Sequence, residues 1–251
     1  MTKRFFHLAI PAALVLAATV ESAPITKSKS TAPPAEGVAA ERAEGDDVFH
    51  AAARQKSLNN LKMLALALHN YADTYGTLPQ DVVDKDGKPL LSWRVKLLPF
   101  LEQDDLAKQF KMDEAWDGPT NKPLLARIPK LFESPRVKVK EPGYTVYQGF
   151  NGPGAMFEKG IKPLKFADVL DGTSNTIFAI ETSVAVPWTK PIDLPFDPKQ
   201  DLPDLGKAYN GMPLAAVLDG SVRTLDLGKM SPKTLKAAIG RSDGIVMGAD
   251  W

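Results

Sequence analysis

The feature that most constrains this chain is a long helical repeat of apolar residues over residues 46–75. Apolar side chains recur there in steps of three and four, which places them on one face of an α-helix. Asp46 or Asp47 is suited to cap the start of this helix, and Gly76, followed by Pro79, ends it. The apolar seam comprises Leu58, Leu61, Leu64 or Ala65, Leu68, Tyr71 or Ala72, and Tyr75. At roughly 1.5 Å per residue the helix is about 45 Å long, and its apolar face requires a partner.

The N-terminal segment has the charge and hydropathy pattern of a secretory signal peptide. Lys3 and Arg4 form a basic start, and residues 5–20 are mostly apolar and carry no charge. We expect a signal peptide over residues 1–22 that is cleaved after Ser22. The alternative is a retained anchor, but the apolar run is shorter than the roughly 20 residues that a spanning helix needs. The pattern predicts export to the periplasm or the cell exterior, with no stable membrane span after cleavage.

Two further segments follow the expected signal peptide. Residues 23–45 are rich in Ser, Thr, Pro, Ala and Glu and lack periodic apolar positions, which is typical of a disordered linker. Hydrophobic residues make up 44% and charged residues 24% of the 251-residue chain, as in an ordinary globular protein. We therefore expect one folded domain over residues 46–251.

Short helices and then short strands follow the long helix. The further helical candidates are a stretch from Ser92 that is bent or broken at Pro99, a segment at 122–127, and a last helix from Ser231-Pro232 to about Gly240. The strand candidates are residues 144–148, 176–180, 214–218 and 222–225, the last two joined by an Asp219-Gly220 turn. This order predicts an α+β fold in which the long N-terminal helix packs on an antiparallel sheet. The expected core includes Leu61, Leu64, Leu68, Trp93, Leu97 and Val217.

Net charge and cysteine content exclude several classes of function. The formal net charge is +1, which gives no electrostatic basis for binding nucleic acid or an anionic membrane surface. Cysteine is absent, so the chain has no disulfide, thiolate nucleophile or cysteine metal ligand. Because the net charge is close to zero, we expect no nucleic-acid partner.

The residues suited to catalysis do not form a known motif. His69 and Asp73 lie one turn apart on the long helix and share a face, as a metal pair requires, but the His-Glu-x-x-His pattern of a metalloprotease is absent. The run 171–174 is explained by a turn before the next strand, and no Gly-x-Ser-x-Gly motif occurs. We predict a protein that is not an enzyme and has no catalytic, cofactor-binding or metal-binding residues.

Two sets of residues remain as candidate binding features. The first is the proline-rich acidic loop 193–204, which contains Asp193, Asp197, Asp201 and Asp204. Its oxygen ligands suit calcium, but a solvated acidic loop accounts for the same residues and is the interpretation that we adopt. The second set is aromatic: Trp116, Trp188 and Tyr209 would line a groove for a sugar or a peptide if the fold gathered them.

Several phrases along the chain resemble one protein family. They are Asn59–Lys62, Leu66–Tyr71, Asp73–Pro79, Ser92–Val95, Leu97–Gln103, Asp171–Thr176, Val186–Pro191 and Asp219–Val222. In this order they are similar to a large planctomycete family of exported proteins with the domain of unknown function fifteen fifty-nine. The resemblance spans about residues 57–225. It implies a type IV pilin or pseudopilin fold, and the family is also labelled as extracellular solute-binding.

The chain departs from that family pattern at three points. An ordinary signal peptide stands where members have a prepilin leader, which weighs against pilus assembly. Ser57 and Ser134 stand where members often carry cysteines, so the resemblance implies that a disulfide is missing here. Tyr209 stands ten positions before Asp219, where the family often has a histidine, so any chemistry of that histidine is absent.

Two functions of different classes follow from the sequence. The first is a non-catalytic structural or protein-interaction module of the cell envelope, with envelope proteins or a second copy of the chain as partners. The alternative is an extracellular binding protein for a small solute such as a sugar or a peptide. A ligand pocket in the folded protein would favour the second function, and a filled, flat surface would favour the first.

Overall fold

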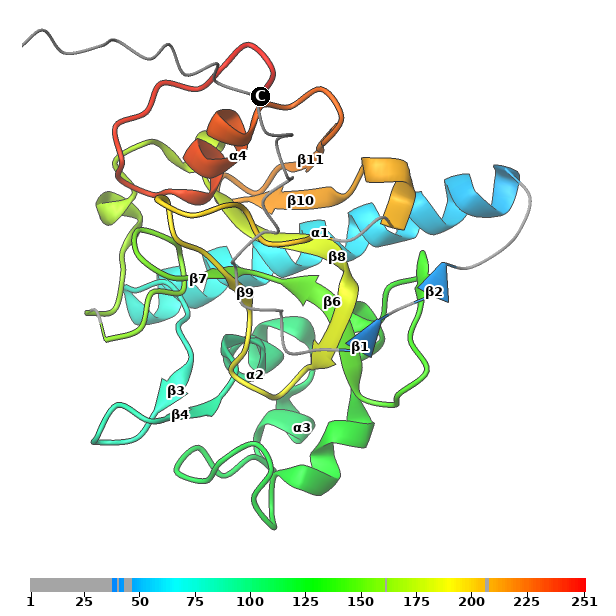
Figure 1. Cartoon of the computed structure of the whole chain (residues 1–251). Helices are drawn as coiled ribbons and strands as arrows, with labels where there is room; N and C mark the ends of the chain where they lie inside the picture. The colour runs from blue at the N-terminus through cyan, green and yellow to red at the C-terminus, as the bar shows by residue number, and fades with distance from the viewer. Residues whose placement is uncertain (1–37, 40, 43–46, 161, 206–207) are drawn as a thin grey trace, which may run out of the picture. The chain divides into compact units, whose positions relative to one another are not determined.

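A long N-terminal helix is the main structural element of the protein. The computed structural model describes residues 38–251 except 40, 43–46, 161 and 206–207 (Figure 1). Helix α1 (Asp47–Tyr75) has 29 residues and ends at Gly76, as predicted. Leu61, Leu64 and Leu68 are fully buried, so the predicted seam is the face that packs on the rest of the domain.

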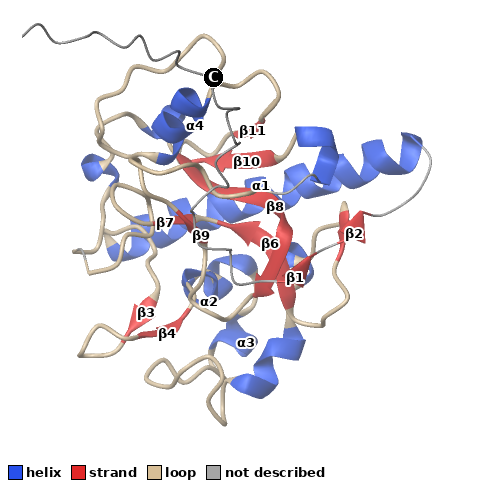
Figure 2. Cartoon of the chain, viewed as in Figure 1, coloured by secondary structure: helices blue, strands red, loops and turns tan. Residues whose placement is uncertain are grey.

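An antiparallel sheet lies against α1. Its five strands are β1 (Val38–Ala39), β6 (Tyr144–Gln148), β8 (Ile177–Pro187), β10 (Leu214–Val217) and β11 (Val222–Thr224). Strand β8 is central and pairs with β1, β6 and β10, while β11 pairs with β10 (Figure 2). Asp219 and Gly220 lie in the turn between β10 and β11, and α1 packs against β10. The α+β fold with a long helix on an antiparallel sheet is confirmed; the likeness to pilins stays a prediction.

Strand β8 is longer than the sequence predicts. The pattern ends the strand at Ile180 because the following residues are polar, whereas the structure continues it to Pro187 over 11 residues in all. Glu181 pairs opposite Tyr147 of β6, and its side chain is buried among hydrogen-bond donors. A polar residue inside a strand therefore hides the continuation of the strand from its hydropathy pattern.

Part of the predicted linker forms short strands. The predicted signal peptide over 1–22 and most of the predicted linker 23–45 lie outside the described residues. Within the linker range, however, β1 pairs with β8, and β2 (Glu41–Arg42) pairs with β5 (Val137–Lys138), both antiparallel. Four residues of the range predicted as linker are thus paired with strands of the domain, and the linker assignment of the other residues stays a prediction. Two-residue strands are held by backbone hydrogen bonds and are too short to show a side-chain period.

Short helices and turns connect the main elements. Helix α2 (Trp93–Lys96) is capped by Ser92, and a 3₁₀ turn over Leu98–Leu101 follows, so the predicted break at Pro99 is confirmed. The other helical segments are α3 (Asp104–Ala107), 3₁₀ turns at Lys122–Arg127, Lys130–Phe132, Phe166–Asp168, Thr173–Asn175 and Ala208–Gly211, and α4 (Pro232–Ile239). Ser231 caps α4 and Gly240 ends it, as predicted.

Two small strand pairs lie beside the main sheet. Strands β3 (Val82–Val83) and β4 (Pro89–Leu91) form an antiparallel hairpin, and β7 (Phe150–Asn151) pairs in parallel with β9 (Leu194–Pro195). The β7–β9 pairing attaches the start of the proline-rich loop 193–204, which we predicted to be solvated, to the rest of the domain. The hairpin forms one wall of the groove described below.

Both faces of the main sheet are covered. On one face Phe178, Leu214 and Ala216 join the cluster that contains the α1 seam, together with Trp93 and Leu97. On the other face Ile177, Ile180 and Ala215 pack against Leu235, Ala238 and Ile239 of α4. Val217 is also fully buried, so all six predicted core residues are buried. Burial on both faces explains why β10 is a continuous apolar run.

Candidate functional site

A groove of about 490 Å³ lies near the C-terminal end of α1 and is lined by the β3–β4 hairpin and by the described residues of loop 157–163. Its polar and charged lining residues are Thr77, Gln80, Asp81, Lys96, Glu158 and Lys159. Its apolar lining comes chiefly from Tyr71, Leu78, Val82, Val83, Pro89, Phe157 and Pro163. The volume lies in the usual range of small-molecule sites, roughly 300–1,000 Å³. An apolar lining with a few polar groups is also typical of such sites.

Hydrogen bonds hold the two walls of the groove in place. The Leu78 N–H donates to Leu164 O at 2.6 Å, and Gln80 Nε2 donates to Met156 O at 2.9 Å. Asp81 precedes β3, and its Oδ1 accepts a hydrogen bond of 2.9 Å from the backbone N–H of Trp93, the first residue of α2. Among the described residues Asp81 Oδ2 has no hydrogen-bond donor, so this oxygen is available to a ligand.

The Asp81 carboxyl has an unusual affinity for a proton. Burial, followed by the negative charge of Asp193, raises its pKa from the ordinary 3.8 to about 7. The Trp93 N–H and the positive charges of Arg94 and Lys159 act in the opposite direction and do not offset burial. Asp81 therefore changes its charge near neutral pH, which is characteristic of functional carboxyl groups in clefts.

Lys96 faces the same groove with the opposite charge. It is the last residue of α2 and is half-buried. Burial lowers its pKa, and the negative charge of Asp81 partly opposes this shift. Lys96 forms no ion pair with any described residue, although Asp81 influences it through space. The groove thus contains two opposite charges that act on each other without contact.

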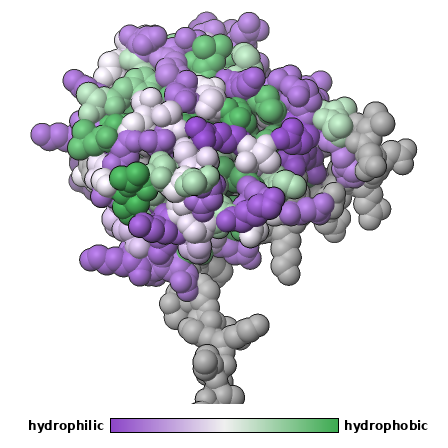
Figure 3. Space-filling view, turned by 90° about the horizontal axis from the view of Figure 1, so that it is seen from above, coloured by the Kyte–Doolittle hydropathy of each residue, from purple (hydrophilic) through white to green (hydrophobic). Residues whose placement is uncertain are grey.

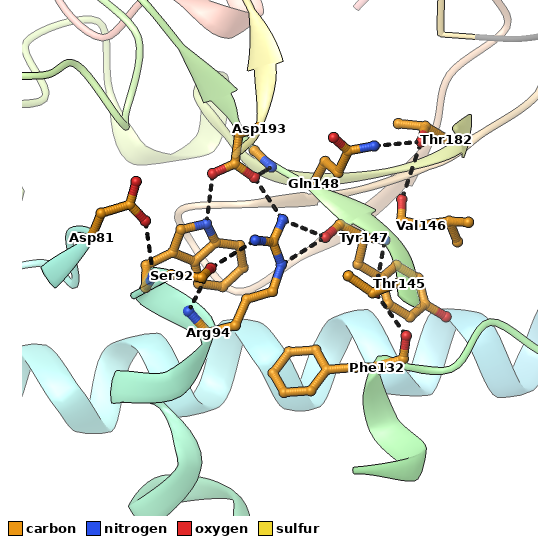
Figure 4. Close-up of polar contacts among 12 residues, drawn as sticks. Asp81, Ser92, Arg94, Phe132, Thr145, Val146, Tyr147, Gln148, Thr182 and Asp193 are labelled. Carbon is orange, nitrogen blue, oxygen red and sulfur yellow. Dashed lines mark hydrogen bonds and ion pairs between the residues drawn. The ribbon is translucent and has the colours of Figure 1, made fainter. Parts of the chain in front are cut away.

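A fully buried ion pair lies beneath the groove (Figure 4). Arg94 Nη2 is 2.6 Å from Asp193 Oδ1, and both side chains have no exposed area. Arg94 also donates to the Tyr147 carbonyl through Nε and Nη2 and to Ser92 Oγ through Nη1. Asp193 accepts two further hydrogen bonds, from Trp93 Nε1 at 3.0 Å and from the Gly149 N–H at 2.7 Å. The charges of Arg94 and Asp193 are therefore satisfied by contacts inside the protein.

The four aspartates of loop 193–204 do not act together. Asp193 points into the core, whereas Asp197 accepts hydrogen bonds from Lys199 N and Gln200 Nε2 of its own exposed turn. The interpretation of the whole loop as solvated is therefore wrong for Asp193, because the β7–β9 pair draws its backbone inward. Within the described ranges no group of three or more His, Asp or Glu side chains is arranged to hold a metal ion.

A second buried polar cluster surrounds Glu181. Ser57 Oγ and Ser134 Oγ each donate to Glu181 Oε1 at 2.6 Å, and Arg136 Nη1 lies 2.8 Å from Oε2. Tyr147 Oη lies 2.8 Å from Ser57 Oγ, and burial, followed by the charge of Glu181, raises the pKa of this tyrosine. The two positions where the resemblance implies cysteines therefore meet at one carboxylate oxygen.

The residues that the sequence singles out for catalysis serve the fold. His69 Nε2 lies 2.9 Å from Leu218 O, and its ring stacks on Phe166 at 4.8 Å between centroids, while Asp73 is exposed. The run 171–174 does form a turn before β8. The Asp171 carboxylate there accepts hydrogen bonds from the N–H groups of residues 243 and 244, which fixes the C-terminal segment.

The aromatic groove predicted from Trp116, Trp188 and Tyr209 does not exist in that form. Trp188 is fully buried, stacks on Phe132 at 5.6 Å and donates from Nε1 to Leu125 O. Trp116 is only half-buried, and Lys190 lies over its ring. The side chain of Tyr209 is outside the described part of the structure. A buried Trp188 is a core residue and cannot face a solute.

The groove residues Asp81 and Lys96 were not predicted from the sequence. Asp81 follows Pro79 in an ordinary turn sequence, and Lys96 is one of many lysines. The sequence around Trp93 gives no signal that distinguishes Lys96 from Arg94, which is fully buried on the same short helix. The hydrogen bond from the Trp93 N–H to Asp81 Oδ1 brings Asp81 next to α2, and loop 157–163 completes the groove that both side chains line.

Comparison with known proteins finds one family. The model of the family described as "Protein of unknown function (DUF1559)", with the short label SBP_bac_10, matches residues 50–156, so this part of the chain is similar to that family. The match confirms the resemblance for α1, α2 and β6, and the later motifs lie beyond it. No curated protein and no solved structure matches the chain significantly. Among the described helices, none combines the length and the hydropathy needed to cross a membrane.

Proposed function

We propose that this protein is an exported, non-catalytic binding protein whose ligand occupies the groove at Asp81 and Lys96. One observation carries this proposal: the groove contains two half-buried opposite charges without ionic partners among the described residues, whereas the buried charges Arg94, Glu181 and Asp193 are all paired. Charged groups are expensive to desolvate, so half-buried charges without partners are the groups that gain most from a ligand.

The use of the other reactive groups supports a role without catalysis. His69 is engaged with a backbone carbonyl, and the Ser57 and Ser134 hydroxyls donate to Glu181. A nucleophilic serine needs a neighbouring base and an open approach. The Glu181 carboxylate is a neighbouring base, but Ser57 is fully buried, so its hydroxyl is closed to a substrate. Export is supported by the basic and apolar start of the chain, and we expect the mature protein to begin at Ala23.

A second candidate function, a protein-interaction module, is favoured by the outer face of α1. Met63 and Leu66 lie one turn apart on this face and are 46% and 52% exposed. Exposed apolar residues next to each other are typical of protein contacts. In the face of the molecule seen in Figure 3, by contrast, apolar side chains stand in small groups between polar ones.

Native mass spectrometry of the protein purified from the envelope fraction of the producing cell separates the two functions. Thr77→Trp fills the groove from its half-buried wall, and Leu66→Asp changes the outer face of α1. A ligand-binding protein carries a small non-covalent adduct that is lost in Thr77→Trp and kept in Leu66→Asp. An interaction module shows no adduct, and its complexes are lost in Leu66→Asp. The second result would overturn the binding proposal.

A further inference from the structure

We propose that the groove binds a free α-amino acid with an apolar side chain, with the ligand's ammonium group at Asp81 and its carboxylate at Lys96. This inference rests on the proposed binding function and names the class of ligand.

The two charges of the groove match the two charges of an amino acid. Asp81 is fixed by the Trp93 N–H through Oδ1 and keeps Oδ2 free of protein donors, while Lys96 has no ion pair among the described residues. The two side chains do not contact each other, so a gap separates them. A zwitterion places an ammonium against the carboxylate and a carboxylate against the ammonium. A neutral sugar leaves both charges without a counter-charge, and a simple anion leaves Asp81 without one.

The remaining charges of the groove do not change this assignment. Glu158 is occupied, because its Oε2 accepts from Arg241 Nη2 at 2.6 Å and from the Gly154 N–H at 3.2 Å. Lys159 is exposed and acts on Asp81 only through space. Asp81 and Lys96 therefore form the partly buried pair that a small ligand meets inside the groove.

The apolar lining indicates the kind of side chain. Leu78, Val82, Phe157 and Pro163 line the same groove as the two charges. The volume of about 490 Å³ is sufficient for a single amino acid. An apolar side chain would cover these residues, and a charged side chain would lose its hydration against them.

The proposal has a pH signature with a defined sign. An ammonium group binds the ionised form of Asp81, whose pKa is raised to about 7 with Asp193, Arg94 and Lys159 as its charged neighbours. The ionised fraction rises about tenfold between pH 6 and pH 8 for a group of this pKa. The affinity for the amino acid should therefore rise by up to about tenfold over the same interval.

Isothermal titration calorimetry of the full mature protein with L-leucine tests the inference. N-acetyl-L-leucine and L-leucinamide each lack one ligand charge, and D-glucose lacks both. The protein variants are Asp81→Asn, which can still accept the Trp93 N–H, and Lys96→Met, with Leu66→Ala, an exposed residue outside the groove lining, as a control. We expect L-leucine to bind, both capped analogues to bind at least tenfold more weakly, and Asp81→Asn to remove the rise in affinity with pH.

The failures of the two proposals can be distinguished. If another solute binds and Thr77→Trp abolishes that binding, while L-leucine does not bind, the amino-acid inference is overturned and the binding function is retained. If L-leucine binds equally well to the wild type, Asp81→Asn and Lys96→Met, the assignment of its charges is wrong. If no adduct is carried by the protein from cells and no probe binds, both proposals are overturned.

Discussion

Arg94–Asp193 and Asp81–Lys96 are two pairs of opposite charge in adjacent parts of the molecule, yet they are built differently. Arg94 and Asp193 are in contact at 2.6 Å, have no exposed area and are surrounded by further hydrogen bonds. Asp81 and Lys96 are half-buried, do not touch and keep open positions toward a groove. Arg94 and Asp193 bind each other and further groups of the protein, whereas Asp81 and Lys96 have no ionic partner among the described residues.

The difference separates groups that stabilise the protein from groups that cost stability. A paired buried charge is costly to break, because its partner is left desolvated and alone. An unpaired half-buried charge is already partly desolvated without a partner in the native state, so its removal should raise the free energy of unfolding. Residues of the second kind are expected at binding sites, where stability is exchanged for affinity.

The largest effect is expected for Arg94→Met. It leaves the Asp193 carboxylate buried without its cation, so the free energy of unfolding should fall by about 3–5 kcal/mol. Urea denaturation of the purified protein measures the change. Arg94→Met combined with Asp193→Asn removes the unpaired charge and should recover part of the loss. A small effect of Arg94→Met alone would mean that the pair is not a stabilising element.

The Ser57→Ala, Ser134→Ala double variant should have the next largest effect. Glu181 Oε1 loses both hydroxyl donors and keeps only the ion pair of the other oxygen with Arg136. We expect a loss of about 1–3 kcal/mol in the free energy of unfolding, measured in the same way. The single variants resolve the contribution of each serine. An unchanged free energy of unfolding would show that Glu181, like Asp81 in the groove, can keep one carboxylate oxygen without a hydrogen-bond donor.

Asp81→Asn should act in the opposite direction. The folded-state pKa of Asp81, about 7, lies above its ordinary value of 3.8, so ionisation disfavours the native state and stability falls as the pH rises between these values. The variant should match the wild type near pH 4 and exceed it by about 1–2 kcal/mol at pH 8, less than full linkage predicts because the group is partly solvated. Urea midpoints at both pH values measure this, and a variant less stable at pH 8 would contradict the comparison.

The smallest effect is expected for Lys96→Met. Methionine keeps much of the apolar stem and removes an ammonium group whose pKa is lowered by burial. The free energy of unfolding at pH 7 should change by less than about 0.5 kcal/mol or rise slightly. Lys108→Met, at an exposed lysine, serves as the matched control. A loss above about 1 kcal/mol would place Lys96 among the structural charges.

Local features of the fold could be predicted because local sequence determines them. The apolar seam of α1, the helix starts at Ser92 and Ser231 and the Asp219-Gly220 turn each depend on a few adjacent residues, and the structure has all of them. The extension of β8 and the pairing of β1 and β2 depend on distant partners and were missed.

The site shows the same division between local and distant contacts. Asp193 and Asp197 lie four positions apart in one acidic loop, and nothing local distinguishes them. Asp193 is buried against Arg94, and Asp197 is half-buried in a turn. Trp188 is likewise of a residue type that often lines binding sites, but its ring packs on Phe132 in the core.

The sequence by itself determined the main helices and strands and their order, the ends of α1 and α4, the core face of α1 and the similarity of residues 50–156 to one family. The tertiary structure decided which charges are paired and which remain open at a groove. The physical reason is that secondary structure follows from hydrogen bonds and side-chain periods over a few residues. The environment of a charge follows from chain segments far apart in sequence, and burial of Asp81 between α2 and loop 157–163 is such a case.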